Sequence, residues 1–576
     1  MSKPSHAPDA PGPVQAGRPL SPAQLLDALD PDQRAVAEHL EGALCVLAGA
    51  GTGKTRAITY RIAHGVAVGA YHPHQLLALT FTKKAAGELR GRLRGLGIEG
   101  AQARTFHSAA LSQLRYFWPS AIGGQILPLQ PGKAPLIAAA ASRLGLGTDR
   151  ALIRDLAAEI EWAKVTNTLP EDYAQAATAR GRSAAGLDAG TIASVLHLYE
   201  EAKSERGVID FEDVLLILAG ILAEREDIAA RVRSQYKHFV VDEYQDVSPI
   251  QQRLLDLWLG RRRQLCVVGD VSQTIYSFAG ATSRYLAEFA REFRGAQTIE
   301  LIRDYRSSPQ IVACANEVIA ADASEGAVRL VSQLPSSVPI VFKEYSDDVE
   351  EAGAIAGEIQ QLRERGVPLG DIAVLYRTNA QSAEFEAALG KAGVDYSIRG
   401  AERFFSRREV REAMVGMRAA ARADVAGSLA SDVKAVLMQS GWREEPPEGA
   451  GAARERWSAL AALLKMAEEM ERARGAGMAE FVAELEERAQ IQAAPDAVTL
   501  ASLHSAKGLE WHAVFLVGMS EGLMPISLAK GEEAIAEERR LMYVGITRAK
   551  QHLHISYAKG NGQRSARKVS RFLHNL

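Results

Sequence analysis

Residues 43–55 constrain this chain more than any other feature of its sequence. The run ALCVLA (residues 43–48) is short and apolar, which predicts a buried parallel strand. The run GAGTGKT (residues 49–55) follows it, and a helical pattern begins at Arg56. A glycine-rich turn between a strand and a helix lets backbone N–H groups surround phosphates at the helix N-terminus. The segment therefore predicts a phosphate-binding loop within a doubly wound α/β fold.

Two polar side chains of this loop predict its chemistry. Lys54 can reach the β- and γ-phosphates of ATP, and the Thr55 hydroxyl can bind Mg²⁺. The strict pattern has glycine where this chain has Ala48, so the match is to a looser variant. A glycine turn that only caps a helix is the alternative, and the preceding strand disfavours it. The expected nucleotide contacts in this segment are Ala48, Gly49, Ala50, Gly51, Thr52, Gly53, Lys54, Thr55 and Arg56.

Acidic and amide side chains follow two further strand-like runs. Residues 238–241 precede Asp242 and Glu243, and residues 265–268 precede Gln273. Asp242 would hold Mg²⁺ directly or through water, and Glu243 would polarise the attacking water. Gln273 could hydrogen-bond the γ-phosphate or that water. Adjacent carboxylates are common on surfaces, but their position after a buried strand favours nucleotide hydrolysis. Kinases, GTPases and motors share all these features.

Composition excludes several classes of protein. With 576 residues, 47% of them hydrophobic and 24% charged, the chain is typical of a globular protein of several domains. No apolar run is long enough to span a bilayer. Residues 1–20 are rich in Pro, Gly and Ala and predict a disordered tail, not a signal peptide. Three distant cysteines disfavour disulfides and a zinc site, which fits a reducing cytoplasm.

Net charge does not indicate a nucleic-acid partner. The formal net charge at pH 7 is −3, although residues 548–576 contain several basic residues and no acidic one. An ordinary solvated charged surface explains that basic end equally well. The partner must therefore be inferred from motifs.

A series of short segments, in fixed order, resembles the motifs of the UvrD/PcrA/Rep group of superfamily 1 DNA helicases. Besides the phosphate loop and the acidic pair, they are LDPDQR (29–34), TFTKKAA (80–86), TFHS (105–108), DFED (210–213), GDVSQTIYSFAGA (269–281), DYRS (304–307), YRTN (376–379), LHSAKGLEW (503–511) and EERRLMYVGITRAK (537–550). The match covers nearly the whole chain after the first twenty residues. It implies an α/β fold of two RecA-like motor domains, each interrupted by a mainly helical insertion.

The resemblance implies roles at the nucleotide site. Gln33 would read the adenine, Tyr305 would stack on it, and Glu510 would bond the ribose. Arg306 and Arg548, from the second motor domain, would place guanidinium groups on the γ-phosphate. Closure of one domain on the other would then drive movement. The implied catalytic residues are Lys54, Thr55, Asp242, Glu243, Gln273, Arg306 and Arg548, with ATP as nucleotide and Mg²⁺ at Thr55 and Asp242.

The resemblance also implies a track for single-stranded DNA. Aromatic rings in these motifs offer stacking platforms worth about 1–3 kcal/mol per base. For each ring, ordinary core packing is the alternative. The implied DNA-binding residues are Thr80, Phe81, Phe106, His107, Tyr276, Phe278, Arg377, Asn379 and His504.

The chain is expected to divide into two split motor domains. The first motor domain is predicted at 21–110 and 205–283, with a helical insertion at 111–204. The second motor domain is predicted at 284–403 and 496–576, with an insertion at 404–495. Its strands are expected near 298–302, 372–376 and 514–517. The second insertion is shorter than the family usually carries, so we expect a reduced helical subdomain with a loop at residues 445–452.

The shortened insertion, alanine-rich helices and Trp511 are similar to an actinobacterial second UvrD-like paralogue. That paralogue continues into a cysteine-rich and HRDC-type tail. This chain stops at Leu576, so we expect the tail to be absent.

Several positions depart from the family pattern. Lys83 replaces an asparagine, where it could add a phosphate contact. Ala279 replaces an arginine, which removes a cation near DNA, and Asp304 replaces an asparagine. Residues 557–571 are expected to form a hairpin turning at 560–562, without the aromatic residue often found at the strand-separating pin. The plain hairpin and the short insertion both favour weak unwinding.

These features predict an ATP-dependent single-stranded DNA translocase and 3′–5′ helicase in DNA repair or replication. Its expected partners are single-stranded and tailed duplex DNA, with repair proteins left open, no membrane and a monomeric state favoured. The expected location is the cytoplasm, at the nucleoid. An ATP-switched DNA-binding scaffold, or a translocase that unwinds little alone, is the alternative. A helicase–nuclease subunit is disfavoured because no nuclease-like domain follows residue 550, and a metabolite kinase because it would not need Arg306 and Arg548.

Overall fold

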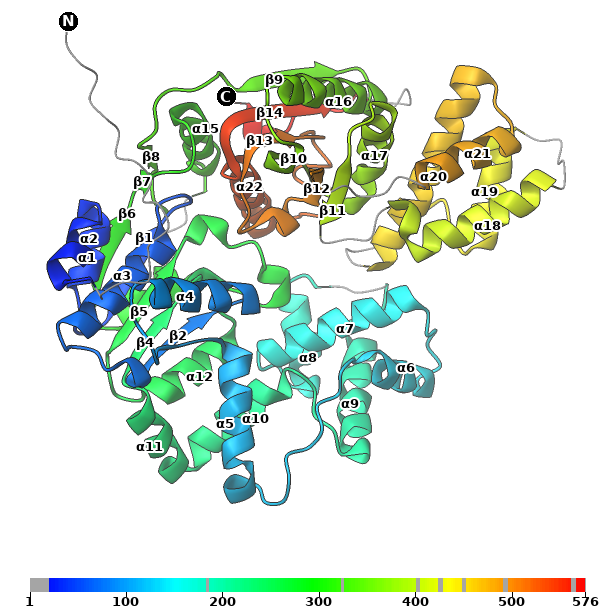
Figure 1. The fold of residues 1–576 in the computed structure, drawn as a ribbon. Helices are drawn as coiled ribbons and strands as arrows, with labels where there is room; N and C mark the ends of the chain where they lie inside the picture. Colours follow the sequence, from blue (N-terminus) through cyan, green and yellow to red (C-terminus); the bar gives the residue numbers. More distant parts are fainter. Residues whose placement is uncertain are drawn as a thin grey trace, which may run out of the picture.

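Two parallel six-stranded sheets, each covered by helices, form the body of the molecule (Figure 1). The computed structural model describes residues 20–182, 186–322, 326–399, 404–422, 428–447, 452–489, 496–560 and 566–574. The predicted α/β class with two RecA-like motor domains is confirmed. The proposed disordered tail (1–20) falls almost entirely outside the described residues. Among those described, no helix has the length and apolar character needed to cross a membrane.

The first sheet carries the phosphate loop. Its order is β3-β2-β4-β5-β1-β6, and every neighbouring pair is parallel. The strands are β1 (Leu44–Ala48), β2 (Leu76–Thr80), β3 (Gln102–Thr105), β4 (His238–Val241), β5 (Leu265–Gly269) and β6 (Gln297–Leu301). The central strands are apolar throughout because helices cover both faces.

Two helical layers enclose this sheet. The first layer holds α1 (Pro22–Asp27), α2 (Pro31–Glu38), α3 (Lys54–Ala67) and α4 (Lys83–Gly95), and the second holds α5 (Phe106–Ala121), α10 (Asp213–Glu224), α11 (Glu226–Gln235) and α12 (Pro249–Leu259). Alternate residues of β1 serve the two cores: Leu44 and Val46 contact the first layer, Cys45 and Leu47 the second.

Two predicted domain boundaries are wrong. Residues 298–302 were placed in the second motor domain, but β6 pairs in parallel with β1, from Leu44 opposite Gln297 to Ala48 opposite Leu301. Residues 111–121 were placed in the first insertion, but they belong to α5, whose apolar face joins the core of the first sheet. Both segments follow the sheet because their apolar residues find a partner there.

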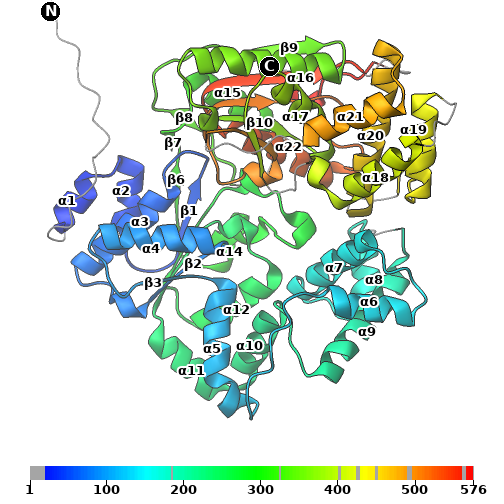
Figure 2. The same ribbon diagram turned by 45° about the vertical axis from the view of Figure 1, so that its right-hand side comes forward.

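The first insertion is a small helical unit with its own core. It contains α6 (Ala134–Arg143), α7 (Arg150–Val165), α8 (Pro170–Ala179) and α9 (Ala189–Arg206). Figure 2 shows these helices beside the layer that contains α10.

The second sheet has the order β11-β12-β10-β13-β14-β9, again with parallel pairs. Its strands are β9 (Val341–Tyr345), β10 (Ile372–Tyr376), β11 (Tyr396–Arg399), β12 (Val498–Ser502), β13 (Trp511–Leu516) and β14 (Ala549–Ala558). Its helices are α15 (Pro309–Ile319), α16 (Asp348–Glu364), α17 (Ser382–Lys391) and α22 (Glu532–Ile546). The short helices α13 (Arg284–Ala287) and α14 (Phe289–Glu292) and the ribbon of β7 (Arg303–Asp304) and β8 (Val331–Ser332) lie in the chain between the sheets.

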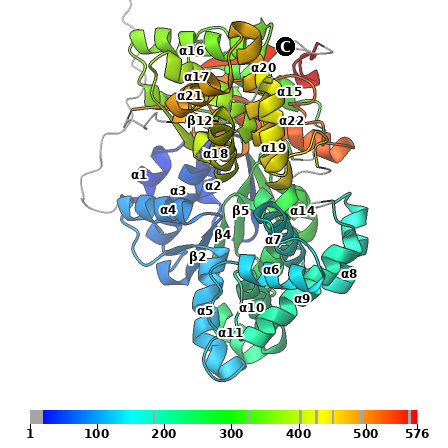
Figure 3. The same cartoon turned by 90° about the vertical axis from the view of Figure 1, so that its right-hand side faces the viewer.

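The second insertion is helical, as expected. It contains α18 (Arg408–Arg422), α19 (Leu429–Gln439), α20 (Ala452–Arg474) and α21 (Met478–Ala489), around a separate core. Figure 3 shows this unit above the first insertion. The two meet where the Ala453 N–H donates to Asp155 Oδ2 at 3.3 Å. Residues 448–451 of the predicted loop at 445–452 and most of the predicted hairpin turn at 560–562 lie outside the described residues.

Candidate nucleotide and DNA sites

The phosphate loop requires glycine at two positions. Gly51 and Gly53 have φ values of 70° and 79°, in the left-handed region that other residues rarely adopt. Gly51 is also closely approached, since a Cβ there would lie 2.4 Å from Asp304 Oδ2. Gly53 is the N-cap of α3, so Lys54 and Thr55 occupy its first turn, where free N–H groups favour an anion. The loop thus has the geometry of a phosphate cradle.

The two carboxylates at the end of β4 stand next to this cradle. Lys54 Nζ lies 3.7 Å from Glu243 Oε1. Burial, together with the charge of Glu243, raises the pKa of Asp242. Burial acts against ionisation of Glu243 too, but the charges of Lys54 and Lys507 hold its pKa below the ordinary value. A divalent cation beside Asp242 would restore its carboxylate, so the donor set of Thr55 and Asp242 fits Mg²⁺.

A chain of amide side chains joins the ends of β4 and β5. Gln245 Nε2 donates to Glu243 Oε2 at 2.6 Å, and Gln245 Oε1 accepts the Asp270 N–H at 3.0 Å. Gln273 Nε2 donates to Asp270 Oδ2 at 2.7 Å. Lys507, from the second motor domain, donates to the Gln273 carbonyl at 2.8 Å. The predicted amide therefore lies at the junction between the two domains.

Gln245 and Lys507 were not singled out from the sequence. Both lie within segments already quoted for the resemblance or beside them, DEYQD (242–246) and LHSAKGLEW (503–511). Lys507 also pairs with the buried Asp246. The available signal was a lysine between the two polar site candidates of that motif, His504 and Glu510.

Arg306 and Arg548 come together at Thr547, and Arg306 also lies beside the phosphate loop. The Arg306 guanidinium donates to the Thr547 carbonyl at 3.3 Å, and Arg548 Nη2 donates to the Thr547 hydroxyl at 3.0 Å. A Cβ on Gly51 would lie 2.9 Å from Arg306 Cβ. Arg548 is only 2% exposed, and burial, with the nearby Arg306 charge, lowers its pKa to about 9. Arg306 thus lies against the first domain's loop, and Thr547 joins it to the buried Arg548.

Glu510 pairs with cations in this structure. Its carboxylate lies 2.6 Å from Arg306 Nε and 2.9 Å from Lys550 Nζ. These charges outweigh burial and lower the pKa of Glu510. A ribose contact by Glu510 would therefore compete with Arg306.

The predicted adenine residues cluster at the start of α2. Asp30 caps this helix: its Oδ1 accepts the N–H groups of Asp32 and Gln33, and its Oδ2 accepts the Tyr305 hydroxyl at 2.8 Å. Gln33 Nε2 donates to the Thr52 carbonyl at 3.0 Å, and Tyr305, 45% exposed, donates its N–H to the Gly51 carbonyl. Gln33 and Tyr305 are thereby both tied to the phosphate loop.

Three rings from the two motor domains form one platform. The ring centroid of Phe278 lies 6.1 Å from that of Tyr276 and 5.8 Å from that of His504. Phe278 is 55% exposed, and the Tyr276 hydroxyl donates to the His504 carbonyl. Burial, with Arg377 and Lys507 nearby, lowers the pKa of His504 to about 3, so its ring is neutral. The exposed Phe278 ring can accept a base.

Phe106 is wrong as a stacking residue. It is 1% exposed and lies in the core of the first sheet, with its ring centroid 6.1 Å from that of Trp258. Phe81 is half-buried against the same core. Neither ring is as exposed to solvent as that of Phe278.

Phe211 was missed as a site residue, although DFED was quoted. It is 46% exposed and stacks on His107 with ring centroids 4.1 Å apart and planes 11° from parallel. Burial, with Lys133 nearby, lowers the pKa of His107 to about 4. His107 therefore carries no charge for a phosphate at neutral pH, and Phe211 covers one face of its ring.

Of the remaining predicted DNA contacts, Arg377 and Thr80 are engaged within the protein. Arg377 forms a bidentate pair with Glu538, with Nη2 2.7 Å from Oε1. The buried Thr80 donates its hydroxyl to the Thr82 carbonyl at 3.2 Å. Asn379 Oδ1 is buried with no hydrogen-bond partner among the described residues. Of these, only Asn379 offers an unused polar atom.

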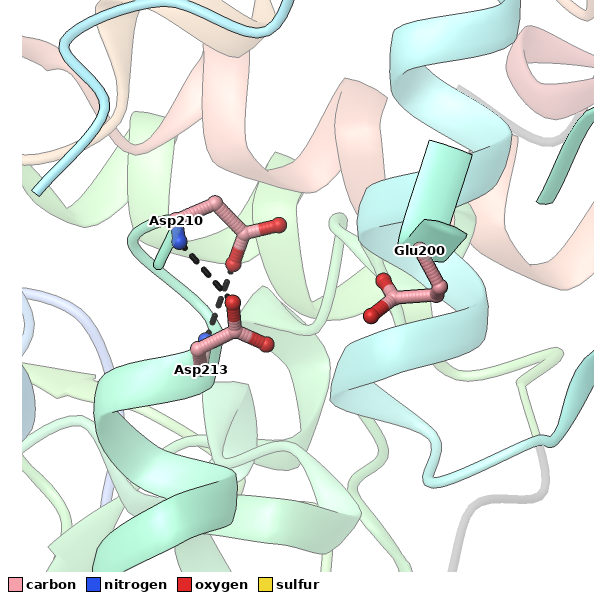
Figure 4. Close-up of side chains that lie close together, drawn as sticks. All are labelled: Glu200, Asp210 and Asp213. Carbon is pink, nitrogen blue, oxygen red and sulfur yellow. Dashed lines mark hydrogen bonds between the residues drawn. The ribbon is translucent and has the colours of Figure 1, made fainter. Parts of the chain in front are cut away.

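A second acidic group lies away from the nucleotide site. Asp210 and Asp213 exchange N–H to carboxylate bonds of 2.9 Å, with Glu200 facing them (Figure 4). Lys164 Nζ lies 2.6 Å from Asp210 Oδ2, and Lys203 Nζ lies 2.6 Å from Asp213 Oδ2. We call these five residues the acid–lysine cluster. Its two ammonium groups occupy the position a cation would take, so the cluster joins α7 and α9 to α10.

Sequence comparison with known proteins agrees with this geometry. The sequence model of the UvrD/REP helicase N-terminal domain matches residues 29–294, and that of the UvrD-like helicase C-terminal domain matches residues 299–447 and 438–560. The chain belongs to the UvrD/REP helicase family. The predicted family, and with it the enzyme class of DNA-dependent ATPase and DNA helicase, is confirmed.

Several relatives in this family are similar over most of their length. The chain is 46% identical to the ATP-dependent DNA helicase UvrD2 of Mycobacterium tuberculosis, covering 96% of this chain and 82% of the relative. It is 32% identical to the ATP-dependent DNA helicase UvrD1 of the same organism, covering 99% and 87%. It is 28% identical to the ATP-dependent DNA helicase PcrA of Bacillus subtilis, covering 93% and 83%. The predicted similarity to a second actinobacterial UvrD-like paralogue is also confirmed.

Proposed function

We propose that this helicase is an ATP-driven translocase that moves 3′ to 5′ along single-stranded DNA and separates strands ahead of it. One observation carries the proposal: Arg306, which shares Thr547 with Arg548 of the second motor domain, lies against Gly51 of the first. An ATP site made by two domains changes when the domains move, which a simple kinase does not need. We place this activity in DNA repair or replication, in the cytoplasm at the nucleoid.

The first motor domain would hold Mg²⁺–ATP. Gly51 and Gly53 would surround the phosphates, Lys54 would bind them, and Thr55 with Asp242 would hold Mg²⁺. The metal neutralises phosphate charge when bound. Glu243, kept ionised by the lysines around it, is suited to orient and deprotonate water.

Exchange of partners at Arg306 supplies a switch. In the described conformation Arg306 pairs with Glu510, and a γ-phosphate would draw its guanidinium from that carboxylate. Glu510 is then free for the ribose, while Lys507 and Gln273 connect the same junction to the Phe278 platform. Binding and release of nucleotide would thereby alter how the platform holds a base.

Steady-state ATPase assays with and without single-stranded oligo(dT) test this proposal. We expect strong stimulation by DNA, and a loss of about 10²–10³ in rate for Lys54→Ala, the scale of removing one charge-stabilising group. Lys391→Ala, at the exposed end of α17, is the matched control and should behave like wild type. An ATPase rate that does not change when DNA is added would reject the proposed motor activity.

Unwinding is tested separately from hydrolysis. We expect separation of a duplex with a 3′ single-stranded tail and little separation of one with a 5′ tail. The short second insertion predicts a low unwinding rate. Preference for the 5′ tail would reject the proposed polarity without rejecting the ATPase.

A further inference from the structure

The turn that carries Phe278 is held from two directions. We define the Phe278 turn as residues 276–280. On one side Ser277 N–H donates to Glu537 Oε1 of α22 at 3.1 Å. On the other side Gly280 has φ +87°, and a Cβ there would lie 2.7 Å from Val165 Cγ2 at the end of α7. The turn is therefore packed between the second motor domain and the first insertion.

Arg182 of the first insertion reaches the carbonyl of Phe278. Its Nη1 donates to that oxygen at 3.1 Å. Its Nε and Nη2 form a bidentate pair with Glu159 of α7, at 3.0 and 2.8 Å. Its guanidinium lies 4.4 Å from the ring centroid of the buried Trp162. A bidentate pair and a cation–π contact fix this guanidinium in one orientation.

The contact constrains the backbone of Phe278 and leaves its ring free. The ring stays 55% exposed while its carbonyl accepts from Arg182. Residues 269–281 contain no lysine or arginine, so the guanidinium at this turn comes from the insertion. Glu159 is itself fixed, since it accepts the Tyr173 hydroxyl at 2.6 Å. A rigid support of this kind lowers the ordering cost when a base stacks.

We propose that Arg182 is a positioning residue that holds the Phe278 ring in its base-stacking orientation. The inference rests on the proposed DNA-translocating function. Arg182 acts through the carbonyl of Phe278 and makes the first insertion part of the DNA platform. Movement of α7 relative to the first sheet is thereby transmitted to the ring that grips a base.

The test compares Arg182→Ala with Arg180→Ala in oligo(dT)-stimulated ATPase assays. Arg180 lies over the same Trp162 ring, 5.6 Å from its centroid, and is the matched control. We expect Arg182→Ala to raise the DNA concentration for half-maximal stimulation about fivefold to tenfold, the scale of one lost hydrogen bond. The rate at saturating DNA should change less than twofold. Arg180→Ala should leave both quantities within twofold of wild type.

A double-mutant cycle with Phe278→Ala separates positioning from general destabilisation. In the Phe278→Ala background we expect Arg182→Ala to change half-saturation less than twofold. An equal effect in both backgrounds, or an Arg182→Ala variant that matches Arg180→Ala, would overturn the role of Arg182. Absence of DNA stimulation in the wild-type protein would instead contradict the proposed function. Thermal melts of all variants identify loss through unfolding.

Discussion

Burial of single side chains decides which aromatic residues can serve DNA. Phe106 and Phe278 both lie in motifs that predict DNA contact, and the sequence does not separate them. Phe106 begins α5 and faces the sheet, whereas Phe278 sits on a short turn and faces outward. The direction of each ring depends on residues distant in sequence, such as Trp258 and His504.

The two rings should therefore respond differently to truncation. Phe278→Ala should weaken oligo(dT) binding by about 1–3 kcal/mol, the value of one stacked base, with little change in thermal stability. Phe106→Ala should lower the free energy of unfolding by about 3–5 kcal/mol, because it leaves a cavity in the core. Fluorescence anisotropy and thermal melts measure the two effects. Weaker DNA binding by Phe106→Ala at unchanged melting temperature would contradict the assignment.

The buried carboxylate of Asp304, beside the phosphate loop, destabilises the folded state when it is ionised. Its Oδ1 accepts the N–H groups of Arg306 and Ser307, while its buried Oδ2 has no partner among the described residues. Burial raises the pKa of Asp304. The folded state therefore binds its proton more tightly than the unfolded state, and stability is lost as pH rises through the raised pKa.

Asp304→Asn should thus stabilise the protein above that pKa. The amide keeps an oxygen for both N–H groups and cannot ionise, so we expect a gain on the order of 1 kcal/mol at pH 8. The gain should shrink as pH falls, because wild-type Asp304 then becomes neutral. Thermal melts at several pH values measure it, with the exposed Asp27→Asn as control. A variant less stable than wild type at pH 8 would contradict this account.

Within the nucleotide site, the sequence predicted identities better than pairings. Lys54 lies near Glu243, and Arg306 lies against Gly51 of the same loop. The pairing of Arg306 with Glu510 was not predictable, because it depends on how the two sheets meet. Local spacing determines which groups follow a strand, and domain contacts determine what they touch.

At the scale of helices and strands, the acid–lysine cluster joins the first insertion to α10. Both lysine ammonium groups are almost fully buried among its carboxylates. Burial opposes ionisation of Asp210, but Lys164 and Lys203 hold its pKa below the ordinary value. This contribution is present above the ordinary pKa of aspartate and is lost as pH falls through the lowered one.

Removing one ammonium should weaken that joint, whereas removing metal should not. Lys164→Met leaves two buried carboxylates short of a partner and should cost about 3–5 kcal/mol. The melting temperature should fall by roughly 2–4 °C per kcal/mol, and Lys391→Met should change it little. A chelator added without nucleotide should leave the wild-type melting temperature unchanged. A lower melting temperature with the chelator would show that the cluster binds a cation.

The positions of the strands were predicted more reliably than the sheet to which each strand belongs. The strand at 238–241 agrees with β4, and that at 372–376 agrees with β10, because runs of apolar β-branched residues are local signals. The strand near 298–302 was assigned to the wrong sheet. Its partner, β1, is more than two hundred residues earlier, and no local pattern records that pairing.

At the scale of the whole molecule, the two sheets meet at both functional sites. Arg306 lies against Gly51 of the phosphate loop, while His504 and Glu537 reach the Phe278 turn. One relative movement of the domains therefore changes nucleotide and DNA contacts together. An ATP-switched scaffold could use the same contacts without net movement, so directional displacement is the decisive property.

Displacement of streptavidin from biotinylated oligo(dT) measures that property directly. A motor moving 3′ to 5′ should remove streptavidin from the 5′ end in an ATP-dependent reaction, much faster than from the 3′ end. Lys54→Ala should remove it from neither end, and Lys391→Ala should match wild type. Equal slow loss from both ends, despite DNA-stimulated hydrolysis, would contradict translocation and favour the scaffold.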